Sequence, residues 1–428
     1  MSSSDDLVPL GDALDALSFE REVAQARADL EVALGRRQEG AGPIDFVDAE
    51  TLLDTEYGPT PWLVDGICTE QAVMVIGGEP KTAKTWAALE LAIAVATDTP
   101  FVGEFRVKSA DGRGAFLFLC EDNPRSVQRR LKSMVKGRGP VLAGWGKRLA
   151  VKALGSMQID DVAALARYVA TVRQSAIRPA VVVFDPLRDL HQNNEDSSTE
   201  MAGVYKALRA LRTVLGCAVV FVHHAGKATA DGEKRRGGQK LRGSSALHGA
   251  VDAGLYLTSP TRQRDEDKKK TTMSAVVESE VKAASGAGDF GLSLEVFDDD
   301  NREAIRAQWV FSREAEQVKT DSVKSKWTAR IINCLRRHDA DKPTVPVPLR
   351  QIRSDLGVSG RQGQALADLL GELVAAGQIE SIPGVQGHGA YRIATVAKPA
   401  ARAARPSASD DHWPDDPDDD DDESSWMT

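Results

Sequence analysis

The sequence predicts an α/β fold, in which a mostly parallel sheet carries helices on both faces and a small C-terminal domain follows. Two observations lead to this fold class. Between residues 62 and 312, short apolar runs alternate with helix-like segments, and most of these runs are continuously apolar. Such runs are typical of parallel strands that are buried on both faces. After residue 326 the pattern changes to helices followed by a short hairpin.

Six apolar runs are predicted as strands, and helix-like segments separate the first five. The strands are predicted over residues 72–76, 114–120, 150–154, 180–184, 218–222 and 253–257. The helices are predicted over residues 84–97, 124–136, 160–176 and 199–215. Two later runs, residues 273–281 and 291–297, are predicted to form a hairpin that extends the sheet. Because ligands of such sheets bind at the carboxyl ends of the strands, the residues after each strand are the functional candidates.

A chain of 428 residues is expected to form two or three domains. The composition places an N-terminal helical arm and linker at residues 1–57, a core at 58–320, a C-terminal domain at 326–395 and a disordered acidic tail at 396–428. The arm is predicted as a surface helix or an assembly arm, because four leucines recur at roughly helical spacing: Leu14, Leu17, Leu30 and Leu34.

The apolar content of 42% and the charged content of 27% are typical of a globular protein. The net charge of −9 comes from the tail, where residues 410–423 hold ten acidic residues and no Lys or Arg. The rest of the chain is therefore left at +1. Its balanced charge fits a protein that concentrates positive charge locally.

The four cysteines, Cys68, Cys120, Cys217 and Cys334, form no C-x-x-C pair, so buried free thiols are favoured over zinc or disulfides. The polar, acidic N-terminus does not resemble a signal peptide. No apolar stretch approaches the roughly 18 residues of a membrane span. These observations favour a cytoplasmic protein with no membrane partner.

A phosphate-binding loop is the most informative motif. Residues 78–85 read G-E-P-K-T-A-K-T and lie between the first strand and the first helix. In such loops the backbone N–H groups hold phosphates, the lysine reaches the β- and γ-phosphates, and the Thr hydroxyl binds Mg²⁺. Ala83 stands where the strict pattern has glycine. We therefore predict an ATP and Mg²⁺ site formed by Gly78, Glu79, Pro80, Lys81, Thr82, Ala83, Lys84, Thr85 and Trp86.

Two carboxylates follow later strands. Asp185 ends the run at 180–184 and is predicted to hold Mg²⁺ together with Thr85; the alternative is a turn or helix cap. Glu121 follows the run at 114–120 and is predicted to act as the base or orienting group for the attacking water. The alternative for this segment is a helix cap, formed by Asp122 or Asn123 ahead of Pro124.

The run at 218–222 ends in two histidines, and His224 is the favoured candidate to hydrogen bond a γ-phosphate, although a structural histidine is equally compatible. A basic, glycine-rich segment then follows over residues 225–242. It is either a solvated loop or a nucleic-acid-binding loop that uses Lys227, Lys234, Arg235, Arg236 and Lys240. At its end, Arg242 is a candidate arginine finger, reaching the γ-phosphate of a neighbouring subunit.

The C-terminal pattern of helix, helix, turn, helix and two-stranded wing predicts a winged-helix domain over residues 326–394. Its recognition helix is predicted at residues 360–376, with Arg361 offered to DNA; protein contact is the alternative. The tail embeds Trp413 and Trp426 among acidic residues. It is either a solubilising tail or a segment that competes with DNA for the basic loop or recruits replication proteins.

Taken in order, the motifs G-E-P-K-T-A-K-T, C-E-D, V-V-V-F-D-P-L, V-H-H-A and R-G-S-S resemble those of RecA-like P-loop ATPases. Within that class, the core resembles the RepA-like hexameric replicative helicases, relatives of DnaB-type helicases. The resemblance covers about residues 58–300. It implies a RecA-like fold and catalytic roles for Lys84, Glu121, Asp185, His224 and Arg242. DnaB-like relatives often carry Lys-x-Arg near the last strands, whereas Lys282 here is followed by two alanines, which shifts weight to Arg242 as the finger.

The resemblance therefore implies an ATP-driven, ring-forming DNA motor, a plasmid or phage type of replicative helicase. Its partners would be single-stranded or forked DNA and further copies of the chain in a hexamer. The alternative is a DNA-binding regulatory or recombination accessory ATPase that does not unwind strands. A metabolic kinase is disfavoured, because the basic loop and the C-terminal domain would have no role in it.

Overall fold

The computed structural model describes residues 10–37, 46–108, 112–195, 197–224, 247, 249–282, 285–313, 315–341, 345–358, 362–383 and 389–394. The chain divides into two compact units, Met1–Val318 and Lys319–Thr428. No helix among the described residues is long and apolar enough to cross a membrane.

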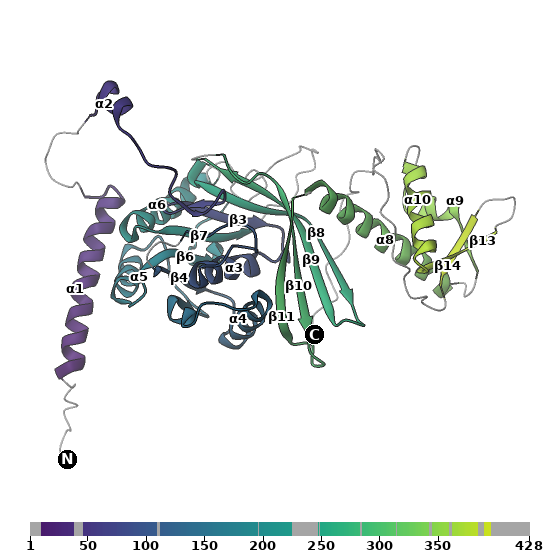
Figure 1. The fold of residues 1–428 in the computed structure, drawn as a ribbon, viewed down its shortest axis with the longest axis horizontal. Helices are drawn as coiled ribbons and strands as arrows, with labels where there is room; N and C mark the ends of the chain where they lie inside the picture. The colour runs from purple at the N-terminus through teal and green to yellow at the C-terminus, as the bar shows by residue number, and fades with distance from the viewer. Residues whose placement is uncertain are drawn as a thin grey trace, which may run out of the picture. The chain divides into compact units, whose positions relative to one another are not determined.

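A nine-stranded sheet forms the centre of the first unit (Figure 1), with the strand order β11-β10-β9-β8-β3-β7-β6-β4-β5. From β8 to β5, neighbouring strands run parallel. On the other side of β8, three strands continue the sheet in antiparallel pairs. The strands are β3 (Val73–Gly78), β4 (Gly114–Leu119), β5 (Leu149–Lys152), β6 (Pro179–Asp185), β7 (Ala218–His224), β8 (Ala253–Asp265), β9 (Lys270–Val281), β10 (Phe290–Asp298) and β11 (Ala304–Ser312).

Helices cover both faces of this sheet. One face packs against α3 (Lys84–Thr97) and α4 (Pro124–Arg138), and the other against α5 (Val162–Gln174) and α6 (Ser198–Leu215). Side chains alternate along each strand. In β3, for example, Met74 and Ile76 join the α3 core, whereas Val73 and Val75 join the opposite core. The predicted α/β class, a mostly parallel sheet with helices on both faces, is confirmed.

The N-terminal segment forms α1 (Leu10–Ala33), which packs beside α5 and α6 in Figure 1. Ala26 and Leu30 are fully buried there, while Leu17 is exposed. The predicted surface helix is therefore present, and its C-terminal half contributes to the core. A short helix α2 (Ala49–Asp54) follows, and Asp48 caps it by accepting a hydrogen bond from the Thr51 N–H.

The six predicted strands and the predicted hairpin are all present. Their ends lie within three residues of the prediction, except that β8 continues to Asp265, eight residues beyond its predicted end. The edge strand β11 was not predicted. The longest apolar run in its residues, A-I-R-A-Q-W-V-F-S, is W-V-F, and of these nine residues only Ala307 is buried. A two-stranded ribbon, β1 (Trp62–Val64) with β2 (Cys68–Thr69), also precedes the sheet.

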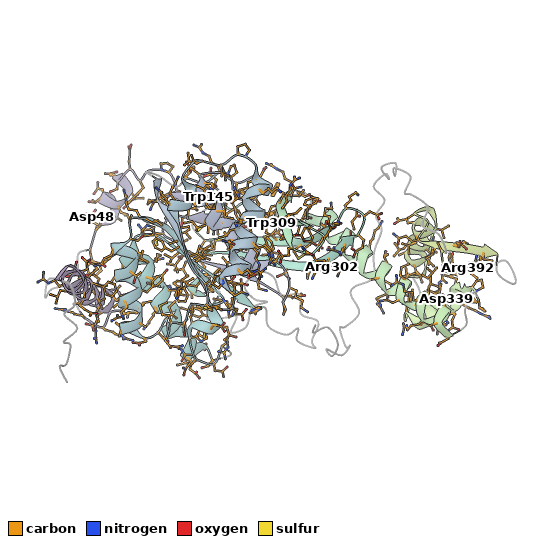
Figure 2. The ribbon with its side chains drawn as sticks, turned by 90° about the horizontal axis from the view of Figure 1, so that it is seen from below. Asp48, Trp145, Arg302, Trp309, Asp339 and Arg392 are labelled. Atoms are coloured by element: carbon orange, nitrogen blue, oxygen red, sulfur yellow. The ribbon has the colours of Figure 1, made fainter. Side chains whose placement is uncertain are left out.

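The second unit is a small domain with its own core. Its elements are α8 (Ala315–Asp341, which starts just before the unit), β12 (Val347–Pro348), α9 (Leu349–Asp355), α10 (Gln362–Ala375), β13 (Ile379–Pro383) and β14 (Gly389–Ile393). The strands form an antiparallel sheet in the order β12-β14-β13. Arg392, labelled in Figure 2, joins the last two strands through an ion pair with Glu380. Trp327, Ile331, Ile352 and Leu370 lie in the core between the helices and this sheet.

Candidate functional site

The loop between β3 and α3 begins at a glycine that no other residue can replace without strain. Gly78 has φ of 153°, and a Cβ on it would lie 2.5 Å from the carbonyl oxygen of Leu257. The next residues, Glu79, Pro80 and Lys81, are exposed, whereas Thr82 is buried and its hydroxyl donates to the Glu79 carbonyl. The loop therefore presents an exposed outer edge and a buried base.

Ala83 has a backbone conformation that glycine adopts more readily than alanine. It has φ of 63° and ψ of 24°, in the left-handed region, and it is the N-cap of α3. Lys81 is also left-handed, with φ of 64°. This conformation costs a residue with a Cβ about 1 kcal/mol or more. The alanine at this position therefore causes local backbone strain and does not change the geometry of the loop.

Lys84 occupies the centre of this loop. Its side chain is buried, and its ammonium group donates to the Glu79 carbonyl and lies 3.5 Å from the Thr82 hydroxyl. Burial lowers the pKa of Lys84 to about 8, against the opposing effects of Asp185 and Glu79. A phosphate placed at the loop would favour the charged form of this lysine.

Asp185 lies beside the loop, at the end of β6. Val181 and Val183 of this strand belong to the α3 core, so Asp185 projects to the same face. The Thr85 hydroxyl lies near the Asp185 carboxylate and acts to lower its pKa. The side chain is only 6% exposed, and its second oxygen, Oδ2, has no hydrogen-bond partner. Burial raises the pKa of Asp185 to about 6; the Thr85 hydroxyl opposes this shift, and Asp122 and Glu121 reinforce it.

This arrangement fits a divalent cation. A buried carboxylate oxygen without a partner is costly unless a cation or a proton satisfies it. Oxygen ligands from one or two protein groups, together with substrate phosphates, are the set that Mg²⁺ prefers. Asp185 and the Thr85 hydroxyl supply those oxygens next to Lys84, so the residues present fit Mg²⁺.

Glu121 lies two residues beyond the end of β4, close to Asp185. Leu119 of β4 is in register with Asp185, and the Cys120 N–H donates to the Asp185 carbonyl at 2.9 Å. Partial burial raises the pKa of Glu121, and the charges of Asp189 and Asp122 add to that shift. A carboxylate with a raised pKa is a better proton acceptor at neutral pH.

The residues after Glu121 have structural roles. Asn123 caps α4 by accepting a hydrogen bond from the Ser126 N–H at 2.9 Å, and Pro124 occupies the first turn. Asp122 pairs with Arg130 at 2.7 Å, and Arg130 also lies 5.6 Å from the ring centroid of Trp86. The capping interpretation thus applies to Asn123 and leaves Glu121 available for chemistry.

The two histidines of β7 point in opposite directions. β7 lies between β3 and β6, and His224 is in register with Gly78 at the start of the loop. Val220 and Val222 face the α3 core, so His224 projects to that face as well. His223 is buried on the other face, with its Nδ1 atom 3.7 Å from a carboxylate oxygen of Glu195. Of the two, only His224 therefore shares a face with Lys84 and Asp185.

The remaining predicted residues lie outside the described part of the chain. They are Lys227, Lys234, Arg235, Arg236, Lys240, Arg242 and Arg361, together with the acidic tail. Their roles remain predictions. Lys282 is described, and its ammonium group donates to the Gly249 carbonyl at 3.2 Å.

The sequence did not point to several residues around the site. Asp189 lies in the short 3-10 turn η3 (Leu187–Leu190) and acts on both Glu121 and Cys120 through its charge. Arg130 pairs with Asp122 from a position that no motif marks. Glu195, on the other face of the sheet, likewise lies 3.7 Å from His223 without a sequence signal. For the other two, the only sequence signal is position: Asp189 follows Asp185 by one short turn, and Arg130 lies on the helix that starts after Asn123.

In the sheet, β7 lies between β3, which leads into the phosphate loop, and β6, which ends at Asp185. The strand beyond β6 is β4, and Glu121 follows it. This strand order and loop give the first unit a RecA-like arrangement of its sheet. A family model described as an AAA domain matches residues 41–230, which include the loop, Glu121, Asp185 and both histidines. Among solved structures, the chain is similar to one described as a DnaB-like replicative helicase and its interactions with primase. The identity is 13%, the TM-score is 0.38, and the match covers 69% of this chain and 76% of that chain.

Proposed function

We propose that the protein is an ATP-hydrolysing DNA motor, a ring-forming replicative helicase of plasmid or phage type that acts in the cytoplasm. Residues 58–320 would be its ATPase core. The observation that carries this proposal is the buried, unpartnered Asp185 oxygen beside Thr85 and Lys84 at the end of a phosphate-loop strand. A strand–loop–helix unit with no catalytic role would gain nothing from that arrangement.

Each residue has a role in hydrolysis. The loop backbone and Lys84 would hold the β- and γ-phosphates of ATP, and Thr85 and Asp185 would hold the metal ion. Bound Mg²⁺ supplies neutralisation of the phosphate charge. Glu121 would orient the attacking water and accept its proton, and its raised pKa supports that role. His224 would hydrogen bond the γ-phosphate from the neighbouring strand.

The connection to DNA rests on sequence adjacency. The basic segment 225–242 follows directly from β7, the strand that carries His224. A change at the γ-phosphate would reach this segment through one short strand, and its Lys and Arg residues would grip the DNA backbone. Arg242 at its end would act on the ATP of a neighbouring subunit, which requires a ring or a filament.

The second unit would contact duplex DNA or a protein partner. Its order of helix, strand, two helices and hairpin supports the winged-helix interpretation of residues 326–395, with α10 as the recognition helix. The N-terminal segment 1–57 would be an assembly arm. The acidic tail would compete with DNA for the basic segment, so deleting residues 410–428 should tighten DNA binding at low salt; an unchanged affinity and salt slope would remove this role.

Strand displacement tests the proposal. The full-length protein should hydrolyse ATP faster with single-stranded DNA and should unwind a forked duplex, while Lys84→Ala should do neither. Electron micrographs with ATP and single-stranded DNA should show rings. DNA-stimulated ATPase activity without unwinding would instead establish the accessory ATPase.

The shared ATP site is tested by mixing variants. Arg242→Ala and Glu121→Ala should each lose turnover as pure proteins, because each lacks one half of every site. Mixed subunits should regain part of the activity, since some interfaces then combine an intact Glu121 with an intact Arg242. If no mixture regains activity, Arg242 does not act across an interface.

A further inference from the structure

A cluster of candidate metal ligands lies in the second unit, which holds no residue assigned to ATP. Cys334 and His338 are one turn apart on α8, and Asp355 is the last residue of α9. One ligand atom from each, the Cys Sγ, a His ring nitrogen and a carboxylate oxygen, all lie within 4.8 Å of one another. The sequence favoured free buried thiols for all four cysteines. The fold makes Cys334 different, because it brings a histidine and an aspartate to its thiol.

The separations are close to those of a tetrahedral site. The His338 Nε2 atom lies 2.5 Å from the Asp355 Oδ2 atom, and the Cys334 Sγ atom lies 3.6 Å from the same oxygen. Around Zn²⁺, with bonds of about 2.0–2.3 Å, neighbouring ligand atoms lie about 3.2–3.8 Å apart. The Cys–Asp separation already falls in this range. The His–Asp pair needs to open by less than about 1 Å, within reach of a rotation of either side chain.

The surroundings suit a bound cation with one open position. Cys334 is buried against Ile331, Leu335 and Ile352, which fixes the thiol. The His338 and Asp355 side chains are 35% and 25% exposed, so the opposite side of the cluster opens to solvent and can admit a water as the fourth ligand. Gln351 donates to the second Asp355 oxygen at 2.6 Å and holds the carboxylate in place.

The ligand chemistry selects zinc over magnesium or calcium. A thiol, an imidazole and a carboxylate form a mixed set that suits Zn²⁺, whereas Mg²⁺ and Ca²⁺ prefer oxygen ligands only. We propose that Cys334, His338 and Asp355 bind a zinc ion that ties the end of α8 to the end of α9. This site would stabilise the helices ahead of α10 and does not depend on the ATPase function of the first unit.

Metal binding must displace a proton from the thiol. A coordinated thiol is deprotonated outright, so each bound zinc would release this proton. Binding should therefore weaken as the pH falls.

Cobalt titration of the full-length protein tests the site. The protein is reduced, freed of metal with a chelator and titrated with Co²⁺, whose bond to a thiolate gives a charge-transfer band in the near ultraviolet. We expect one Co²⁺ per chain with this band, and its loss when one equivalent of Zn²⁺ is added. Co²⁺ at the Thr85–Asp185 site gives no such band, because that site has no thiolate.

Three variants complete the test. Cys334→Ser should abolish the band, and His338→Gln should weaken Co²⁺ binding more than about 100-fold, beyond the 10- to 100-fold typical of losing a supporting hydrogen bond. Because His338 is partly exposed, His338→Gln is expected to stay folded. It therefore tests the site even if the buried Cys334→Ser variant does not fold. Cys120→Ser, a control at a more exposed thiol in the first unit, should keep the band.

Two outcomes overturn the site. If the wild-type protein, with its thiols reduced, shows no charge-transfer band with Co²⁺, the three side chains only hydrogen bond one another and bind no metal. A band that survives in both Cys334→Ser and His338→Gln comes from adventitious binding elsewhere.

Discussion

Two buried carboxylates on the α3 face of the sheet, Asp185 and Glu90, differ in one respect that separates function from architecture. Glu90, in the middle of α3, is 3% exposed and has an arginine partner: its Oε1 atom accepts hydrogen bonds from Arg138 and from the Val102 N–H, the latter at 3.0 Å. Asp185 is 6% exposed, yet one of its oxygens has no partner. Burial raises the pKa of both groups. Burial alone therefore does not mark a site; the two carboxylates differ in that Glu90 is paired with an arginine and Asp185 is not.

The comparison predicts that Asp185 and Lys84 contribute mainly to turnover. Asp185→Asn and Lys84→Ala should each lower ATP turnover by about 10³-fold, the scale of removing one preorganised charge from a reacting phosphate. Asp185→Asn should also leave the metal-free protein as stable as the wild type or more stable, because it removes an uncompensated buried charge. Steady-state turnover and denaturant unfolding measure the two effects. A large loss of stability in Asp185→Asn would make this residue structural and break the comparison.

Glu90 should behave in the opposite way. Glu90→Gln leaves Arg138 without its charged partner and is expected to destabilise the protein by about 3 kcal/mol. The turnover of the folded fraction should be unchanged, since Glu90 lies within α3 and away from the loop. Replacing both members, as in Glu90→Gln with Arg138→Met, should restore part of the stability. Urea unfolding of the single and double variants gives the coupling, and additive losses would show that the pair does not act as a unit.

The pH dependence should also differ between Asp185 and its neutral variant. The folded pKa of Asp185, about 6, lies above its ordinary value of 3.8. The folded state therefore holds this proton more tightly than the unfolded state. In metal-free protein, this residue's contribution to stability should increase as the pH falls from about 6 toward 4. The contribution should amount to roughly 2–3 kcal/mol.

The free energy of unfolding is measured against pH for the wild type and for Asp185→Asn. The difference between the two profiles isolates the contribution of Asp185 from those of Glu90 and other groups. Protons and Mg²⁺ compete for the same carboxylate, so Mg²⁺-dependent turnover should fall as the pH drops below about 6. Identical unfolding profiles in the two proteins would mean that Asp185 is not the group that titrates.

The sequence predicted the parallel sheet and the strand-end positions, because both depend on local patterns. Continuous apolar runs mark β3, β4, β6 and β7, and Asp185 and Glu121 follow two of them directly. The edge strand β11 was not predicted, because a strand that is partly exposed at the sheet edge needs no long apolar run. Arg130, Asp189 and Glu195 were not predicted for another reason. Tertiary packing decides which side chains they meet, and no local pattern records it.

The same limit applies to Cys334. Its spacing from His338 places both on one helix face, but only the packing of α9 against α8 adds Asp355 to them. Sequence spacing alone had favoured a free thiol at this position.

Ala83 gives the smallest predicted effect and the sharpest view of the loop. Ala83→Gly should relieve the left-handed strain at the N-cap of α3, while the added freedom of the unfolded chain takes back part of that gain. The net stabilisation should be about 0.5–1 kcal/mol, measured by urea unfolding, with nucleotide affinity unchanged within about twofold. Lys81→Gly, at the other left-handed residue of the loop, is the matched control and should give a similar gain. If Ala83→Gly stabilises the protein but weakens ATP binding, the strain at Ala83 holds the loop in its phosphate-binding shape. The alanine would then be part of the site, as the unpartnered oxygen of Asp185 is.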